Sequence, residues 1–285
     1  MKLIRFGKQG EEKPGILLSN DEKIDVSSFV SDYDEKFFGS GGLISLKDWL
    51  SENEASAPRL DDNVRIGPPI ARPSKIICIG LNFKDHAAES GFDAPEEPLI
   101  FGKATSAICG PYDNIIIPRG SDQTDWEVEL GVVIGKKTSY VDQDQALEHV
   151  GGYVLHNDVS ERAFQKDRGG QWIKGKSADT FAPMGPFMAT PDEIDNISDM
   201  RMWLNVNGEN MQDGNTSNLI FSVDHVVSYL SQFMTLLPGD VISTGTPAGV
   251  GMGMNPEKYL KPGDVVELGI DGLGSSKQNV VAYEE

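Results

Sequence analysis

The sequence predicts an α+β protein that is mainly β, and three observations support this fold class. Runs of β-branched and apolar residues are frequent, helical patterns are few, and strands do not alternate regularly with helices. A doubly wound parallel sheet needs that alternation, so we reject it. With 285 residues, the chain is long enough to bury a full core.

Residues 1–70 are expected to form a small N-terminal α/β domain. Three strand-like pieces come first, KLIRFG, PGILLS and EKIDV, and an amphipathic helix is expected near Leu46–Leu50. Polar sequence then leads to Gly67, Pro68 and Pro69. Because the character of the chain changes after Pro73, residues 71–285 are expected to form the main domain.

The main domain begins with the apolar strand KIICIG. Further strands are expected at NIIIP, WEVELGVVIG, GYVLHNDV, MWLNVNG, DVISTG and DVVELGID. Helices are expected at Lys84–Ser90, Asp144–His149 and Val223–Phe233, the last with Ser222 as its N-cap.

Composition narrows the class of protein. A net charge of −19 and a pI near 4.5 disfavour nucleic-acid binding, since no basic patch appears. The first residues lack an apolar signal-peptide stretch, and no run of about 18 apolar residues occurs, so we expect a cytoplasmic protein without a membrane span. Cys78 and Cys109 lack CxxC spacing and are expected to be buried free thiols.

Glu127 and Glu129 alternate with apolar residues in the expected strand WEVELGVVIG, so both carboxylates lie on one face. If that face is enclosed, a cation must offset their repulsion, and oxygen ligands of this kind suit Mg²⁺, Mn²⁺ or Ca²⁺. The alternative is a solvated sheet face. Asp158, at the end of GYVLHNDV, favours the metal site because strand ends often present functional groups. His156 nearby is expected to be structural.

An ion held by Glu127, Glu129 and Asp158 would leave positions for water and for a substrate that chelates through carboxylate and keto oxygens. His86 and Glu89 share a face of the helix after KIICIG, so Glu89 could orient His86 as a general base. The alternative for HxxE is an ordinary surface pair.

Two later segments suggest substrate contacts. SERAFQKDRGGQWIKGKSADTF is polar and broken by glycines, and it could be a mobile lid that brings cations to an anionic substrate, or its charges could simply be solvated. Its candidate side chains are Arg162, Gln165, Lys174 and Lys176. The glycine-rich turn from Gly245 to Gly251, with its N–H groups and the Thr246 hydroxyl, could cradle a carboxylate or be a tight loop. It lacks dinucleotide spacing, so no nucleotide cofactor is implied.

With these motifs in order, the chain resembles the fumarylacetoacetate hydrolase family. The resemblance covers roughly residues 72–285. Its motifs are GLNFKDH from Gly80, Glu127 with Glu129, NDVSER from Asn157, KSADTF from Lys176, and GTPAGVG from Gly245. It implies a mixed β-sandwich roll, a homodimer and an active site at these motifs.

The resemblance also implies roles for individual residues. Glu127, Glu129 and Asp158 match the metal ligands, with Mg²⁺ as the expected ion. His86 and Glu89 match the water-activating dyad, and Lys176 matches a stabilising cation. The substrate-binding positions are Phe83, Lys103, Arg162, Gln165 and Thr246. Phe83 stands where many relatives carry Tyr, and the segment Cys78–Gly80 offers no fourth carboxylate ligand.

The leading functional hypothesis is hydrolysis of a carbon–carbon bond in a 2,4-dioxo acid, which yields pyruvate and a second acid. The segment RGGQWIKGKSADTFAPMGPF is similar to members that act on 2,4-diketo-3-deoxy sugar acids. The alternatives are oxaloacetate decarboxylation or keto–enol tautomerisation, a ureidoglycolate-lyase-like activity, and a non-catalytic protein that binds small acids.

Overall fold

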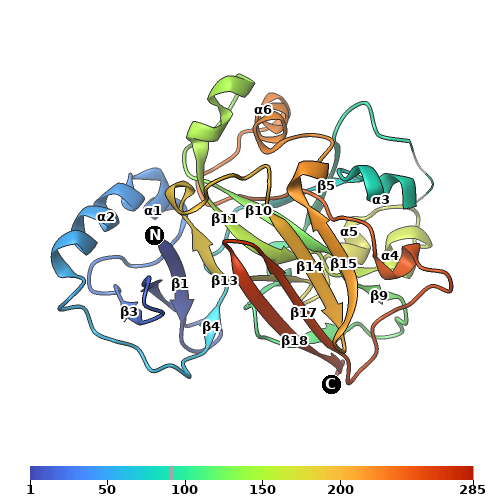
Figure 1. Cartoon of the computed structure of the whole chain (residues 1–285), viewed down its shortest axis with the longest axis horizontal. Helices are drawn as coiled ribbons and strands as arrows, with labels where there is room; N and C mark the ends of the chain where they lie inside the picture. The colour runs from blue at the N-terminus through green and yellow to red at the C-terminus, as the bar shows by residue number, and fades with distance from the viewer. Residues whose placement is uncertain (90, 92, 285) are drawn as a thin grey trace.

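The computed structural model describes residues 1–89, 91 and 93–284, and its main feature is an 11-stranded mixed sheet (Figure 1). The strand order is β3-β2-β1-β13-β11-β10-β16-β5-β6, with β4 paired to β1 and β7 to β13. Its strands are β1 (Lys2–Phe6), β2 (Lys13–Leu17), β3 (Lys23–Asp25), β4 (Ile66–Gly67), β5 (Ile76–Gly80), β6 (Leu99–Lys103), β7 (Ile108–Cys109), β10 (Val128–Ile134), β11 (Val150–Asn157), β13 (Ala182–Ala189) and β16 (Val241–Ser243).

A second sheet of five strands packs against β10 and β11. Its order is β15-β14-β17-β18-β8, and a separate two-stranded piece joins β9 to β12. The bounds are β8 (Ile115–Ile117), β9 (Thr124–Asp125), β12 (Ser160–Glu161), β14 (Arg201–Val206), β15 (Glu209–Asn215), β17 (Val265–Ile270) and β18 (Gly274–Ala282). This arrangement confirms the predicted α+β class that is mainly β, with mixed sheets packed face to face.

Helices are short and lie around the sheets. They are α1 (Glu35–Gly39), α2 (Gly42–Asn53), α3 (Lys84–Glu89), α4 (Arg162–Lys166), α5 (Ile173–Lys176) and α6 (Val223–Phe233). Helix α6 has the predicted bounds, and Ser222 occupies its N-cap position without a side-chain cap hydrogen bond. Helix α3 matches the expected helix through Glu89, and Ser90 lies outside the described residues.

The helix expected at Asp144–His149 is of the wrong type, because the structure has a 3₁₀-helix over Gln143–His149. This segment packs against α6, and that tertiary contact, which a local sequence pattern does not contain, overrides the expected α-helical geometry. The sequence patterns also miss β13, whose Pro183 and Pro186 would normally argue against a strand.

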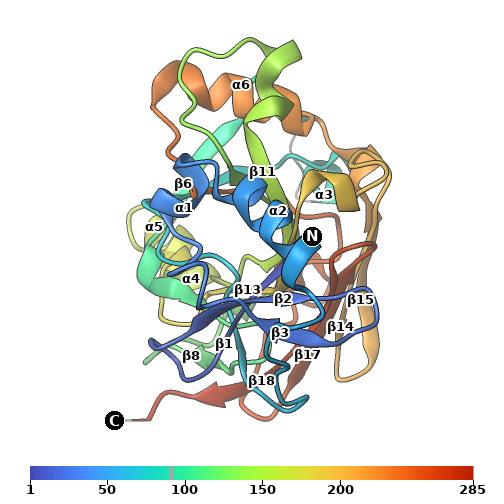
Figure 2. The same cartoon turned by 90° about the vertical axis from the view of Figure 1, so that its left-hand side faces the viewer.

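The N-terminal strands extend the large sheet, because β1 pairs antiparallel with β13 (Figure 2). In this pairing Lys2 lies opposite Ala189 and Leu3 opposite Met188. The division of the chain at residue 70 remains a prediction.

The register around β10 places a polar face inside the protein. Glu129 lies opposite His156 in the antiparallel pair β10–β11, and Gly131 lies opposite Ser243 in β10–β16. Side chains alternate along a strand, so the intervening apolar residues of β10 point to the other face and join the hydrophobic core. The polar face therefore collects side chains from three neighbouring strands.

Candidate functional site

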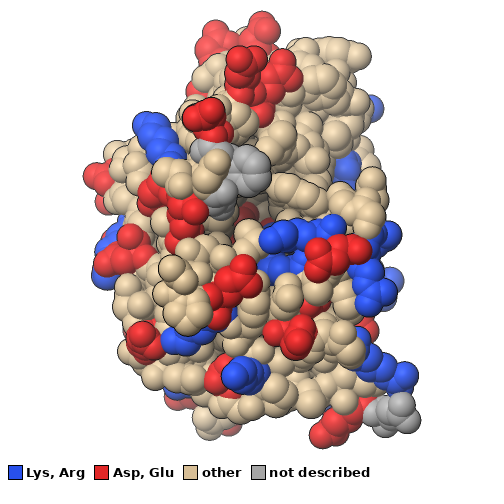
Figure 3. Space-filling model, turned by 90° about the vertical axis from the view of Figure 1, so that its right-hand side faces the viewer, with Lys and Arg blue, Asp and Glu red and all other residues tan. Residues whose placement is uncertain are grey.

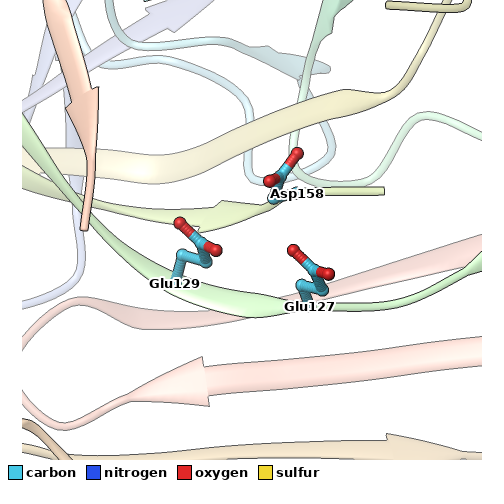
Figure 4. A group of neighbouring side chains, drawn as sticks. All are labelled: Glu127, Glu129 and Asp158. Carbon is cyan, nitrogen blue, oxygen red and sulfur yellow. The ribbon is translucent and has the colours of Figure 1, made fainter. Parts of the chain in front are cut away.

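Three carboxylates meet on this polar face. Glu127 precedes β10, Glu129 lies within it, and Asp158 follows β11 (Figure 4). One oxygen from each lies within 4.8 Å of the others, a spacing that could hold a metal ion. Their exposed fractions are 5%, 2% and 0%, which rules out the alternative of a solvated sheet face.

Buried cations pair with two of these carboxylates. Lys176 Nζ lies 2.8 Å from Glu127 Oε2 and 2.7 Å from Asp158 Oδ2, so one ammonium bridges both. Lys103 pairs with the other oxygen of Asp158, and Arg162 Nη2 lies 2.6 Å from Glu127 Oε1. Burial would raise the pKa of Asp158, but Lys103 and Lys176 lower it below its ordinary range. Asp158 therefore stays ionised.

Glu129 has no cationic partner among the described residues. Its Oε2 accepts hydrogen bonds from the Ser243 hydroxyl at 2.5 Å and from the Gly245 N–H at 3.0 Å. Burial, followed by the charges of Asp158 and Glu127, raises the pKa of Glu129 well above its ordinary value. Asp125 shares Arg162 with Glu127, so the cluster has four carboxylates but only three cations among the described residues, Lys103, Lys176 and Arg162. With all four carboxylates ionised, one negative charge is left over, and a divalent cation would offset it.

The predicted histidine–glutamate pair lies at the same site. His86 Nδ1 is 3.4 Å from Glu89 Oε2, and both residues line the cavity. The Glu89 carboxylate also accepts hydrogen bonds from the Gly249 N–H, at 3.0 Å to Oε1 and 3.1 Å to Oε2. This pair is anchored to a distant loop, which an ordinary surface pair would not require.

The glycine-rich turn binds carboxylates of the protein itself. Its N–H groups at Gly245 and Gly249 donate to Glu129 and Glu89, and those at Gly251 and Met252 donate to Asp125. At Gly245, Gly249 and Gly251 the turn therefore cradles carboxylates as expected, but they are the protein's own carboxylates and not those of a substrate. The physical reason is that buried acidic side chains need donors, and the turn is the nearest source of them.

The segment after Asp158 is not a set of free cations. Arg162 is 3% exposed, donates to Asp125 at 2.9 Å and bonds Gln165 Oε1 through Nη1 at 3.1 Å. Lys176 is 1% exposed, whereas Lys174 is exposed and donates to the Arg168 carbonyl. The alternative of solvated charges is wrong for Arg162 and Lys176, because ion pairs hold both inside the site. The mobile lid stays a prediction.

One cavity of about 650 Å³ joins these groups. Its polar lining residues are His86, Glu89, Glu127, Glu129, Arg162, Gln165, Lys166, Lys176, Thr246 and Glu257. Its apolar wall is formed by Ile79, Leu81, Leu99, Phe101, Trp172 and Met252. Figure 3 shows basic side chains gathered among acidic ones beside a hollow, on the side of the molecule that carries α3 and α4.

Three of the predicted substrate-binding residues line this cavity and two do not. Arg162, Gln165 and Thr246 are lining residues, and Thr246 Oγ1 donates to the Val128 carbonyl at 2.9 Å. Phe83 and Lys103 are buried, and neither is among the described residues that line the cavity. Lys103 reaches the site through Asp158 instead.

Sequence reasoning did not find Asp125, Ser243 or Trp172. Asp125 orients Arg162, Ser243 contacts Glu129, and the Trp172 ring packs against Phe101 with centroids 5.1 Å apart. The only signal in the sequence was the position of Ser243 at the end of an apolar strand.

No helix within the described ranges is long and apolar enough to cross a membrane.

Comparison with known proteins places this site in a family. Residues 75–281 match the model of the fumarylacetoacetate (FAA) hydrolase C-terminal domain. A Burkholderia ambifaria relative, named only provisionally as a hydrolase, is 51% identical over 280 residues and covers 98% of both chains.

Solved structures agree with this match. The fumarylacetoacetate hydrolase of Exiguobacterium antarcticum has a TM-score of 0.87 at 36% identity, over 99% of this chain and 100% of that one. The maleylpyruvate hydrolase of a Sphingobium species, solved with manganese(II) and pyruvate, has a TM-score of 0.83 at 27% identity. A 5-carboxymethyl-2-hydroxymuconate delta-isomerase of Mycobacterium smegmatis has a TM-score of 0.79 at 33% identity. The last two matches cover 100% of both chains. The protein therefore belongs to the fumarylacetoacetate hydrolase family, which contains both hydrolases and isomerases.

Proposed function

We propose that this protein is a divalent-metal-dependent hydrolase that cleaves a carbon–carbon bond in a 2,4-dioxo acid of the acylpyruvate type. The products are pyruvate and a second acid. The observation that carries the proposal is the convergence of a buried three-carboxylate group and the His86–Glu89 pair on one cavity. A maleylpyruvate hydrolase of the same fold, solved with manganese(II) and pyruvate, supports it.

Glu127, Glu129 and Asp158 are the proposed ligands of Mg²⁺, with Mn²⁺ or Ca²⁺ as possible replacements. Their all-oxygen donor set suits these ions. An ionised Glu129 has no cationic partner among the described residues, so a divalent ion bound here would balance its negative charge. When bound, such an ion acts as a Lewis acid that polarises the keto oxygen of the substrate.

His86, Glu89 and Lys176 are proposed to carry out the proton transfer and to stabilise the developing negative charge. His86, oriented by Glu89, takes a proton from water, and the water oxygen then bonds to C4 of the substrate. The C3–C4 bond breaks, its electron pair forms the enolate of pyruvate, and a proton returns to C3. Lys176 lines the cavity, and Asp158 and Glu127 keep it charged despite its burial. Its ammonium group is therefore the proposed stabiliser of that enolate.

Arg162 and Gln165 are proposed to bind the polar end of the substrate. Arg162 fixes the orientation of the Gln165 side chain through its oxygen, which leaves the amide nitrogen as a donor for ligand. Thr246 lines the same wall. We also propose a homodimer and a cytoplasmic location. The roles of Phe83 and Lys103 in substrate binding stay predictions, and both would act from behind the cavity wall.

The apolar wall indicates what the far end of the substrate is like. Leu99 and Phe101 offer no hydrogen-bond groups to a chain of hydroxyls, and Trp172 offers only its indole N–H. An acylpyruvate with an apolar acyl group therefore fits this wall better than a 2,4-diketo-3-deoxy sugar acid does.

The second candidate is isomerisation or keto–enol tautomerisation of a 2-oxo acid, or decarboxylation of oxaloacetate. An isomerase of the same fold favours it, since these reactions need enolate stabilisation without an attacking water. A ureidoglycolate-lyase-like reaction and a non-catalytic acid-binding role are further alternatives.

The test is a substrate panel of acylpyruvates, diketo sugar acids and oxaloacetate, each assayed with Mg²⁺ and with Mn²⁺. Pyruvate, carbon dioxide and exchange of the C3 hydrogens are measured separately. The proposal expects pyruvate from an acylpyruvate, with metal binding seen by calorimetry and lost in Glu127→Ala. Hydrogen exchange without pyruvate would favour the isomerase, and carbon dioxide release would favour the decarboxylase.

A further inference from the structure

We infer that Ser243 and His156 are positioning residues that hold Glu129 in its metal-binding orientation. This inference rests on the proposed metal site. The two side chains and the ligand form a continuous buried chain: His156 Nδ1 lies 2.6 Å from Ser243 Oγ, and Ser243 Oγ lies 2.5 Å from Glu129 Oε2. All three residues are at most 2% exposed.

The sheet register brings these groups together. Glu129 and His156 lie directly opposite each other in the β10–β11 pair. Ser243 lies opposite Gly131, two residues along the same face of β10. An added Cβ at Gly131 would meet Val154 Cγ1 at 2.6 Å and the Val154 carbonyl oxygen at 3.1 Å, so the close strand pairing that sets this register needs a glycine here.

The direction of the hydrogen bonds follows from the number of hydrogens available. A serine hydroxyl has one hydrogen, and with Glu129 as an ionised ligand that hydrogen goes to its Oε2. Ser243 must then accept a hydrogen from His156 Nδ1, which sets the tautomer of the ring. His156 Nε2 is left with the lone pair, and it is buried without a hydrogen-bond partner among the described residues.

That unpartnered nitrogen needs a reason, since buried polar atoms are normally paired. A ring that served only to fill space in the sheet could be apolar. Within the part of the chain that the structure describes, the Nδ1 hydrogen bond to Ser243 is the one side-chain hydrogen bond of His156. The role that fits is orientation of the hydroxyl toward Glu129.

The charges around the three carboxylates explain why uncharged hydrogen-bond donors, and not a further cation, contact Glu129. Three cations, Arg162, Lys176 and Lys103, are paired with Asp125, Glu127 and Asp158, which leaves the charge of an ionised Glu129 without a partner among the described residues. A further cation at Glu129 would compete with the metal ion for the last unbalanced charge. Ser243 and the Gly245 N–H orient the carboxylate while they leave its charge available.

The test measures Mn²⁺ affinity by calorimetry in variants of the full chain. Ser243→Ala and His156→Leu should each weaken Mn²⁺ binding by about 10 to 100-fold, the usual effect of losing an outer-shell partner. His156→Asn keeps an N–H near the Nδ1 position and should retain most of the affinity. The double variant Ser243→Ala/His156→Leu should be no weaker than Ser243→Ala alone, because the two residues act in series.

Ser231→Ala is the matched control. Ser231 is equally buried, accepts from the Val141 N–H and donates to the Ser228 carbonyl, but it belongs to α6. Its loss should change stability without a change in Mn²⁺ affinity. His156→Leu keeps the inference testable if Ser243→Ala does not fold.

The outcomes separate the two proposals. If the wild-type protein binds no divalent ion, the proposed metal site fails, and this inference fails with it. If the wild type binds Mn²⁺ and Ser243→Ala or His156→Leu binds it equally well, only the positioning role is overturned. Equal weakening by His156→Asn and His156→Leu would show that packing of the ring, not its hydrogen bond, matters.

Discussion

The carboxylate of Glu89 is held by the backbone N–H of Gly249, a residue 160 positions further along the chain. The contact ties the short helix α3 to the loop that follows β16. Because Glu89 is also 3.4 Å from His86, the loop controls the geometry of the proposed catalytic pair. Several expected outcomes depend on this and similar long-range contacts.

Gly249→Ala should disrupt the protein more than an ordinary glycine substitution. Gly249 has φ +100°, and an added Cβ would lie 1.9 Å from the Met211 carbonyl oxygen, so the loop must move away from Glu89. We expect a loss of more than about 2 kcal/mol in urea unfolding, together with reduced activity. Gly208→Ala is the control, since Gly208 has φ +79° with nothing within 4 Å. Equal effects of the two changes would contradict the role of the close approach.

Lys176→Met should destabilise the metal-free protein strongly. The change leaves Glu127 and Asp158 buried without the ammonium that bridges them, which typically costs about 3–5 kcal/mol. Urea unfolding with EDTA and then with Mn²⁺ measures the effect. The ion should restore part of the lost stability because it supplies positive charge at the same carboxylates. Lys47→Met, which removes an exposed pair with Asp192, should change little. A Lys176→Met variant as stable as wild type would refute the electrostatic account.

A bound divalent ion should stabilise the fold. At a free concentration about 100 times Kd, binding to the native state alone adds about 2.7 kcal/mol. Thermal unfolding with and without Mn²⁺ should therefore show a rise in midpoint that EDTA reverses. Asp158→Asn should abolish this rise, since Asp158 is one of three carboxylates in the group. A rise that persists in the variant would indicate binding elsewhere.

His86→Ala should lower pyruvate formation by about 10² to 10⁴-fold, because general-base catalysis contributes that much. Calorimetry should show unchanged Mn²⁺ affinity, since His86 is outside the carboxylate group. His225→Ala, a change at a half-buried histidine of α6 that stacks on Phe221 and Tyr229, serves as the control. Retention of full hydrolytic activity in His86→Ala would rule out the dyad.

Cys78 and Cys109 should resist thiol reagents in the folded protein. Burial is the largest cause that raises the pKa of both thiols above the ordinary value of 9.0. The folded state thus keeps its thiols protonated, and stability from this source is complete below pH 9 and declines above it, where only unfolded thiols ionise. Thiol labelling at pH 8 with and without urea measures the access of the reagent to the thiols. Between pH 8 and pH 10, the free energy of unfolding should fall less steeply for Cys109→Ala than for the wild type. Rapid labelling of the native protein would contradict this.

Local patterns were sufficient for much of the fold. Alternation in β10 identified the face that carries Glu127 and Glu129, and the amphipathic pattern of α6 gave its bounds. Strand β13 and the 3₁₀-helix at Gln143–His149 were not predicted correctly. Their conformations depend on tertiary neighbours, β1 and β11 for β13 and α6 for the 3₁₀-helix, which a local pattern does not contain.

The sequence alone determined which acidic residues share a strand face, and the order of motifs identified the family. Only the tertiary structure decided that Lys176 bridges two carboxylates, that the glycine turn binds Glu89 and Asp125, and that Ser243 reaches Glu129. The reason is physical. Strand periodicity is a local property of the backbone, whereas the partner of a buried charge is whichever donor the packed sheets bring within hydrogen-bond distance.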